Sequence, residues 1–350
     1  MELGVFLDFP RDGRSGDAEA FQESLRFARL SEELGFDSVW LAELHFYPNI
    51  SVISSPLIVA TAVAASTKTI RVGTAVEVLP LANPIRLAEE VATLDHVSEG
   101  RFDFGVCRSG AATGYTSYGI PYSESTARFW ECLDVLRKAW TQETFSHQGY
   151  FHQYKNITLA PKPLQSPYPP IRIAANSADT FPRAAKEGLS LFVGLRGVPT
   201  VLQERIHSYR QTWIEQGHPT KSNVLLRLPV YVAKTMAEAQ THPKVGALSF
   251  YHDFVPRIFK EGLPDLNPEE NYERAARGER LSAITYDEIL KTDTAYGTSD
   301  VVINKILELQ ESLGVGGIVA EINFGGKLTR EQVEESMRLF TEEVVPFIRK

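Results

Sequence analysis

The chain has 350 residues, of which 43% are hydrophobic and 23% are charged, an ordinary balance for a globular protein. Its net charge is −8 at pH 7 and no Lys/Arg-rich run stands out, which argues against nucleic acid and anionic membranes as partners. The only cysteines, Cys107 and Cys132, do not indicate a disulfide framework. Because neither a signal-like N-terminus nor an apolar run of bilayer length is visible, we expect a cytoplasmic protein.

Short apolar segments alternate with helical patterns along the whole chain. We expect strands at 3–9, 38–41, 70–79, 101–107, 171–174, 191–193, 224–232 and 317–322. We expect helices at 18–34, 56–65, 84–97, 123–140, 179–187, 201–216, 236–254, 299–313 and 329–348. Eight strands that alternate with helices favour one domain over residues 1–350, an α/β (β/α)8 TIM-type barrel, rather than an open sheet.

Two segments depart from this alternation. Aromatic residues around Gly149 predict an inserted β-hairpin at about 143–160, and we expect its histidines, His147 and His152, to face solvent without a metal role. The stretch 260–296 is charged, contains Pro and Gly, and has no clear periodicity. Because structureless loops of that length are usually functional or disordered, we expect an irregular, lid-like insertion over the active site. No metal-binding motif is found in the sequence.

The stretch GRFDFGVCRSG, residues 100–110, is the strongest candidate for chemistry. Apolar residues alternate from Phe102 to Val106, as in a strand with one face in a core. Cys107 and Arg108 then fall at the C-terminal end of the strand, where parallel α/β proteins place their sites. A guanidinium group there suits phosphate. A surface ion pair for Arg108 and simple burial of Cys107 remain equally good explanations.

Two other expected strand ends carry polar residues. Glu43 and His45 follow the second strand, where His45 could accept or relay a proton and Glu43 could orient it. A structural ion pair between them is the alternative. Ser177 and Thr180 lie where a helix begins after the fifth strand, and could offer hydroxyl and N–H groups to an anion. Alternatively, Ser177 is simply the helix cap.

Several segments resemble one family in order along the chain. They are WLAELHF (40–46), VGTAVEVLP (72–80), NPIRLAEEV (83–91), LDHVSEGRFDFGVCR (94–108) and AANSADT (174–180). These segments resemble bacterial luciferase, most closely its α subunit, within the wider luciferase-like flavin monooxygenases. The likeness extends from the first residue to the closing helix.

This resemblance implies a two-component flavin-dependent monooxygenase with a TIM-like barrel. Reduced FMN would come from a separate flavin reductase, a transient partner, and O2 would be activated as a flavin C4a-hydroperoxide. The substrate would be a small hydrophobic molecule, with carbonyl compounds among the candidates. Because luciferase pairs two barrels, the resemblance also implies a dimer, and we expect a homodimer.

The resemblance also implies roles for individual residues. Arg108, Ser177 and Thr180 match the phosphate-binding positions of the family, and Cys107 matches a cysteine near the reactive flavin carbon. The remaining expected cofactor contacts are Ala75 and Val76, at a non-proline cis peptide beneath the isoalloxazine, together with Ala175 and Asn176. Asn176 replaces a luciferase Glu, so only a backbone contact is expected from it. His45, Glu43 and Cys107 are the expected catalytic residues.

Two departures from luciferase bear on the activity. Leu44 stands where the luciferase α subunit has a catalytic histidine, so light emission by the luciferase route is not expected. Ala111 replaces a tyrosine in the loop after Arg108, which reshapes the expected pocket. Three alternatives stay open: an F420-dependent oxidoreductase of the same fold, a flavin-binding protein or partner subunit without turnover, and an unrelated barrel enzyme.

Overall fold

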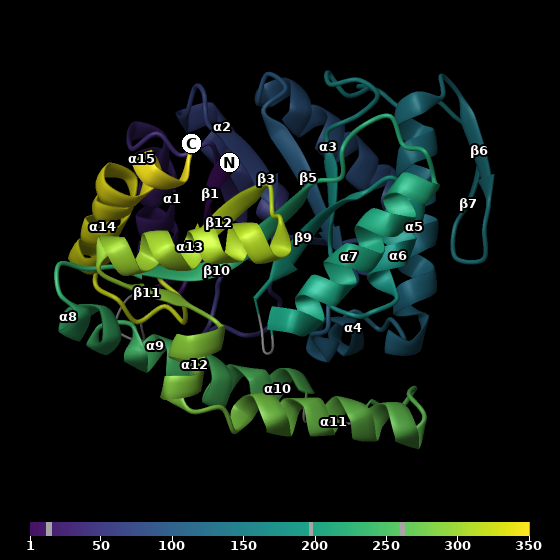
Figure 1. Cartoon of the computed structure of the whole chain (residues 1–350). Helices are drawn as coiled ribbons and strands as arrows, with labels where there is room; N and C mark the ends of the chain where they lie inside the picture. Colours follow the sequence, from purple (N-terminus) through teal and green to yellow (C-terminus); the bar gives the residue numbers. More distant parts are fainter. Residues whose placement is uncertain (12–15, 196–198, 260–262, 350) are drawn as a thin grey trace.

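The computed structural model describes residues 1–11, 16–195, 199–259 and 263–349 (Figure 1). Its centre is a barrel of parallel strands: β1 (Glu2–Leu7), β2 (Ser38–Leu41), β3 (Arg71–Thr74), β5 (Phe102–Cys107), β8 (Ile171–Ala174), β9 (Ser190–Gly194), β10 (Val224–Val232) and β12 (Gly317–Glu321). These strands pair in the order β10-β12-β1-β2-β3-β5-β8-β9, and β9 pairs again with β10, which closes the ring. The expected barrel is therefore confirmed.

Helices surround the barrel: α1 (Asp17–Glu33), α2 (Pro56–Ser66), α3 (Pro84–Val97), α5 (Ser125–Thr141), α6 (Thr180–Lys186), α7 (Pro199–Glu215), α13 (Ser299–Leu313) and α14 (Arg330–Leu339). Local sequence sets their ends. Asn83 caps α3 by accepting a hydrogen bond from the N–H of Arg86 at 3.2 Å, and Pro84 occupies the first turn. Gly314 ends α13 in the left-handed conformation at φ 61°, which glycine adopts without a steric cost.

Strand β10 illustrates why the barrel strands read as apolar runs. A parallel sheet wrapped by helices is buried on both faces, so nearly every side chain of a strand meets other apolar groups. In β10 the sequence VLLRLPVYV is buried at every position except Arg227, which is partly exposed. A charged residue inside such a run has to be stabilised by a partner or by a cavity.

The hairpin is confirmed outside the barrel, but its histidines are not solvent-facing as expected. It consists of β6 (Phe145–Gln148) and β7 (Gln153–Ile157), which pair in antiparallel fashion beside α5 (Figure 1). His147 is only 8% exposed, and its ring lies 3.4 Å from Glu131 and 3.5 Å from Asp134, both on α5. His152 is half-buried. The expectation was wrong because the hairpin packs the ring of His147 against α5, while the ring of His152 stacks on Tyr154 of β7.

The expected irregular insertion at 260–296 is largely helical. Positions 260–262 lie outside the described residues. The remainder contains α11 (Pro268–Ser282), α12 (Tyr286–Thr292) and a short strand, β11 (Ala295–Gly297), that pairs with β10. Each of the two helices begins with a capping box, from Asn267 and Glu270 in α11 and from Thr285 and Glu288 in α12. The expectation of an irregular segment is therefore wrong.

The helix expected at 236–254 is divided into shorter pieces. They are α8 (Met236–Thr241), α9 (Lys244–Ser249), the π-helical segment η3 (Phe250–Phe254) and the added helix α10 (Val255–Phe259). Pro243, which has no N–H to donate, separates α8 from α9. In Figure 1, α10 and α11 lie side by side across the lower end of the barrel, on the same side as the short helix α4 (Ala112–Ser117) that follows β5.

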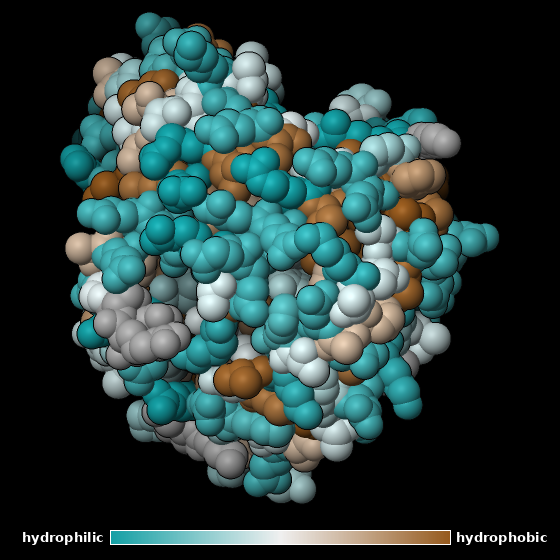
Figure 2. All heavy atoms as spheres, turned by 90° about the vertical axis from the view of Figure 1, so that its left-hand side faces the viewer, coloured by the Kyte–Doolittle hydropathy of each residue, from teal (hydrophilic) through white to brown (hydrophobic). Residues whose placement is uncertain are grey.

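Hydrophilic side chains cover most of the face seen in Figure 2, and hydrophobic side chains are scattered over it. Within the described ranges, no helix combines the length and the hydropathy that are needed to span a membrane.

Candidate active site

A cavity of about 990 Å³ opens at the C-terminal ends of the barrel strands. Helices α10 and α11 cover it, together with Phe250 and Phe254 of η3. Arg274 of α11 fastens this cover, because its guanidinium donates hydrogen bonds to the carbonyls of Gly110, at 2.7 Å, and Ile258. The volume is at the upper end of the range for small-molecule sites, which leaves room for a cofactor and a substrate.

Arg108 lies at one end of the cavity, and no carboxylate among the described residues forms an ion pair with it. The guanidinium of Arg108 donates to the hydroxyl of Ser125 at 3.1 Å and lies 5.3 Å from the ring centre of Tyr122. The hydroxyl of Tyr115 donates to the backbone carbonyl of Arg108 and so holds this segment in place. Arg108 also lines the cavity, so its remaining N–H groups are in reach of an anion there.

Ser177 and Thr180 lie at the same end, beyond strand β8. Their hydroxyl groups share a hydrogen bond of 2.8 Å, and both residues line the cavity with Asn176. The backbone carbonyl of Asn176 accepts a 2.6 Å hydrogen bond from Arg205. The N-cap residue of α6 is Asp179, so the alternative that Ser177 caps this helix is wrong. Two paired hydroxyls and a guanidinium can together bind a phosphate group.

A break in the third barrel strand forms the part of the cavity wall next to this end. The peptide bond between Ala75 and Val76 is cis, as expected, and both residues line the cavity between β3 and the short strand β4 (Glu77–Val78). Close by, a Cβ at Gly105 would lie 1.9 Å from the carbonyl oxygen of Thr74. Only glycine therefore allows β5 to approach the end of β3 this closely.

Cys107 lines the cavity with a buried thiol. The sulfur of Cys107 accepts a 3.0 Å hydrogen bond from the N–H of Ser109, and burial raises the pKa of the thiol. The thiol is therefore protonated at neutral pH and shapes the wall rather than acting as a nucleophile.

Ala174 lines the cavity, whereas the expected contact residue, Ala175, packs into the core at 2% exposure. Both departures from luciferase, Leu44 and Ala111, line the cavity.

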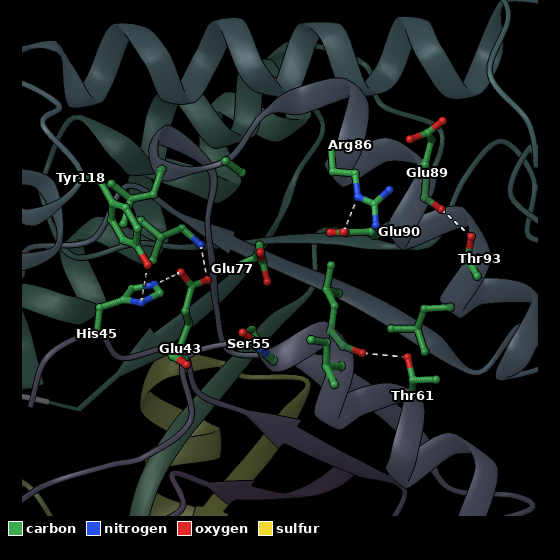
Figure 3. A pocket seen from close by; sticks show the side chains of 18 residues that line it. Glu43, His45, Ser55, Thr61, Glu77, Arg86, Glu89, Glu90, Thr93 and Tyr118 are labelled. Carbon is green, nitrogen blue, oxygen red and sulfur yellow. Dashed lines mark hydrogen bonds and ion pairs between the residues drawn. The ribbon is translucent and has the colours of Figure 1, made fainter. Parts of the chain in front are cut away.

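Glu43 and His45 form a buried hydrogen-bonded pair (Figure 3). The ring Nε2 of His45 lies 2.6 Å from Oε1 of Glu43, and Oε2 of Glu43 accepts a 2.8 Å hydrogen bond from the N–H of Val78. The hydroxyl of Tyr118 lies 3.4 Å from Nδ1 of His45. Burial raises the pKa of Glu43 to about 8 and lowers the pKa of His45, so both groups favour their neutral forms. The pair can hold one proton and move it between Oε1 and Nε2.

His45 faces a second pocket rather than the large cavity. This side pocket, of about 570 Å³, lies between α2 and α3 and is lined by His45, Tyr118, Glu77 and Glu43 among others (Figure 3). Glu43 lines both spaces, so it links them. Oε2 of Glu77 is buried without a hydrogen-bond partner among the described residues, and burial raises its pKa well above the ordinary value.

The sequence analysis missed three polar residues on the opposite side of the barrel. Asp8 follows β1, Arg227 lies in β10 and Glu321 ends β12; Asp8 and Arg227 line the large cavity. Arg227 donates two hydrogen bonds to Glu321, of 2.8 and 2.6 Å, and its guanidinium lies 3.5 Å from the ring centre of Phe6. No motif marks these residues. The sequence marks them only by their position, because each is an ionisable residue in or just after an apolar strand.

Asp8 has an unusual electrostatic environment. Burial raises its pKa to about 7, and the negative charge of Glu321 adds to the shift while Arg227 opposes it. Among the described residues, the only hydrogen bond to its carboxyl group comes from the backbone of Asp8 itself. Asp8 is therefore a carboxylic acid that carries its proton close to neutral pH and faces the cavity.

The fold and the site together define a TIM-type barrel with its site at the C-terminal ends of the strands. Residues 1–316 match the family described as luciferase-like monooxygenase. The chain is 26% identical over 358 residues to the alkanal monooxygenase alpha chain of Photorhabdus luminescens, covering 100% of this chain and 98% of that protein. The chain belongs to the luciferase-like monooxygenase family.

Solved structures share this fold. The monooxygenase RslO1 of Streptomyces bottropensis has a TM-score of 0.81 at 26% identity, with 99% of each chain covered. The oxygenating component of 3,6-diketocamphane monooxygenase of Pseudomonas putida, in complex with FMN, has a TM-score of 0.82 at 21% identity, covering 99% of this chain and 98% of that one. An F420-dependent secondary alcohol dehydrogenase shares the fold at a TM-score of 0.77 and 19% identity, covering 100% and 99%. Proteins of this fold thus use FMN or F420.

Proposed function

We propose that this protein is the oxygenase component of a two-component monooxygenase, which takes reduced FMN from a separate flavin reductase and oxygenates a hydrophobic carbonyl compound with O2. The observation that carries the proposal is the arrangement of Arg108, Ser177 and Thr180 at one end of a cavity of about 990 Å³. One guanidinium and two hydroxyl groups, with no carboxylate bound to them among the described residues, suit a phosphate dianion. Bound reduced FMN supplies the electrons that activate O2.

The residues of the chain hold the ring system of the cofactor and exclude water around it. The cis peptide of Ala75 and Val76 and the neutral thiol of Cys107 offer a flat, uncharged wall next to the phosphate-binding end. The cover formed by α10 and α11, fastened by Arg274, limits access of water to the cavity. The Glu43–His45 pair holds a proton at the edge of the cavity.

The expected substrate class follows from the remaining lining of the cavity. The cover contributes Phe250, Phe254, Ile258 and Phe259 to the cavity lining, and with Leu44 they form an apolar region that suits a hydrophobic molecule. The names of two similar proteins, an alkanal monooxygenase and a Baeyer–Villiger monooxygenase of a diketone, both refer to carbonyl substrates. We therefore place a carbonyl compound first among the candidates. With Leu44 in place of a catalytic histidine, no light emission is proposed.

The deciding experiment is an anaerobic titration with reduced FMN, followed by rapid mixing with O2 in a stopped-flow spectrophotometer. We expect saturable binding and a transient species whose near-ultraviolet absorption differs from that of both reduced and oxidised FMN. Binding without such a species would favour a flavin-binding protein or partner subunit. If FMN does not bind and F420 does, the oxygenase proposal fails in favour of the F420-dependent alternative.

We also propose that the protein forms a homodimer through the exposed side of α2. This helix is apolar on all sides, and Ile58, Ala62 and Ala65 form an exposed apolar stripe, with Ile58 73% exposed. A helix that is apolar all round is normally buried, so a second copy is the expected cover. Sedimentation equilibrium tests this: Ile58→Glu should shift the protein to monomers. An unchanged mass would contradict this interface.

A further inference from the structure

The end of the cavity across from the phosphate-binding residues has a chemistry of its own. In the closed ring of strands, β1 and β12 lie opposite β5 and β8, so Asp8 and Glu321 stand across the barrel from Arg108. Arg227 uses Nε and Nη2 for Glu321, which leaves Nη1 without an acceptor among the described residues, although Arg227 lines the cavity. Asp8 likewise lines the cavity, and in the described part of the chain its carboxyl group has only a local hydrogen bond with its own backbone.

The charges at this end cancel. The positive charge of Arg227 is balanced by Glu321, and Asp8 carries no charge while it keeps its proton. The two groups left over are both hydrogen-bond donors, the O–H of Asp8 and the Nη1–H of Arg227. A pair of donors with no net charge suits a neutral oxygen acceptor and offers little to a phosphate or a carboxylate. A carbonyl oxygen has two lone pairs and can accept both donors.

We propose that Asp8 and Arg227 form a binding site for the carbonyl oxygen of the oxygenation substrate, which orients the substrate and polarises its carbonyl bond. The inference rests on the proposed monooxygenase function and adds the residues that recognise the substrate. Phe6, stacked on Arg227, and Leu44, on the neighbouring strand end, give this site apolar walls. Hydrogen bonds in such a dry setting draw electron density from the carbonyl carbon, where a nucleophile adds.

Matched substitutions at Asp8 separate this role from a structural one. Asp8→Asn keeps a donor of nearly the same shape but does not titrate, and Asp8→Val removes the donor. Because the carboxyl group has only a local hydrogen bond with the backbone of Asp8 in the described structure, neither change breaks a contact with another residue, and both variants should fold. The probes are decanal and cyclohexanone, each labelled with ¹³C at the carbonyl and added to the FMN-bound protein.

Infrared difference spectroscopy then reads the bound carbonyl directly. We expect at least one probe to bind with its carbonyl stretch shifted to lower frequency, as hydrogen bonding requires. Asp8→Val should lose most of this shift and bind the probe about tenfold more weakly, the value of one hydrogen bond. Asp8→Asn should keep both. If neither probe binds the wild-type protein, or if Asp8→Val matches it, the proposal is overturned.

The pH dependence gives a second readout. Probe binding to the wild-type protein should weaken as the pH rises through about 7, because Asp8 then loses its donor, whereas Asp8→Asn should show no such change. Glu321, Arg227 and Glu43 are the other ionisable groups around this part of the cavity, and they are present in both proteins. The same pH dependence in Asp8→Asn would assign the titration to one of them and contradict the proposal.

Two controls keep this test separate from that of the general function. FMN affinity, measured by fluorescence without any carbonyl probe, should be the same in all three proteins. A loss of FMN affinity in Asp8→Val would mean that Asp8 contacts the flavin, which overturns the assignment to substrate. A wild-type protein that forms the transient oxygen-dependent species but binds no carbonyl probe would retain the proposed function and lose only this inference.

Discussion

The two ends of the large cavity use an arginine in opposite ways. Arg108 donates to a neutral hydroxyl of Ser125 and keeps its full positive charge for a ligand. Arg227 donates twice to Glu321, which is 3% exposed, and its charge is neutralised. A cation on a cavity wall is therefore not in itself an anion site, because the carboxylate beside it decides which ligand it can bind. The following changes test this difference, from the largest expected effect to the smallest.

Glu321→Ala should destabilise the protein by about 4 kcal/mol, because it leaves the Arg227 cation unpaired in a mostly buried position. Urea denaturation measures the change. The matched control is Glu124→Ala, which removes the more exposed helical pair with Arg128 at 2.7 Å and should cost less than about 0.5 kcal/mol. Similar losses in both variants would show that Arg227 does not depend on its buried partner.

Asp8→Asn should stabilise the protein at alkaline pH. The folded protein holds the Asp8 proton up to about pH 7, whereas the ordinary value is 3.8, so the folded state binds more protons between these values. The free energy of unfolding of the wild-type protein therefore falls as the pH rises from about 4 to about 7, because the unfolded state releases the Asp8 proton more readily. At pH 8 the variant should be more stable by roughly 4 kcal/mol, at about 1.4 kcal/mol per pKa unit.

The measurement is chemical denaturation at pH 5 and at pH 8. The advantage of Asp8→Asn should be smaller at pH 5, because this pH is only about one unit above the ordinary pKa of 3.8 and most of the loss of wild-type stability occurs at higher pH. A variant that is less stable than the wild-type protein at both pH values would show that the carboxyl makes a structural contact, and would count against its role as a ligand-facing acid.

Arg108→Ala should weaken the binding of FMN by tenfold to a hundredfold, since a hydrogen bond to a charged group is worth about 1.5–3 kcal/mol. Riboflavin, which lacks the phosphate, should bind the variant and the wild-type protein equally. Arg86→Ala, at an exposed ion pair with Glu90 on α3, serves as the control variant. Fluorescence titration gives the affinities, and equal losses for FMN and riboflavin would remove Arg108 from the phosphate site.

The two ends of the cavity also differ in how much of each could be predicted from the sequence. Cys107 and Arg108 lie in a segment whose apolar alternation places them at a strand end, and the resemblance supplied a role for each. Asp8 directly follows an equally clear strand and Arg227 lies in one, but their significance depends on Glu321, which is far away in the sequence and adjacent only in the closed barrel. Pairing of distant strands creates this end of the site.

The cover of the cavity shows the limit of pattern reading in another way. In α11 only Gly278 is buried, so the helix lacks the apolar stripe on which helix prediction depends. The capping box at Asn267 and Glu270 was the available signal. The predicted exposure of His147 was wrong for a related reason, because its burial comes from packing of the hairpin on α5. In each case the deciding contact is nonlocal.

Ser177→Ala should weaken FMN binding by about fivefold, the effect of losing one neutral hydrogen bond worth about 1 kcal/mol. The control is Thr144→Val, because Thr144 and Thr158 share a 2.8 Å hydrogen bond like that of Ser177 and Thr180 but lie at the hairpin, outside the cavity. Thr144→Val should leave FMN affinity unchanged. If Ser177→Ala also has no effect, the hydroxyl groups of Ser177 and Thr180 bond only to each other and not to the phosphate. Arg108 alone would then distinguish the phosphate end of the cavity from the end at Arg227.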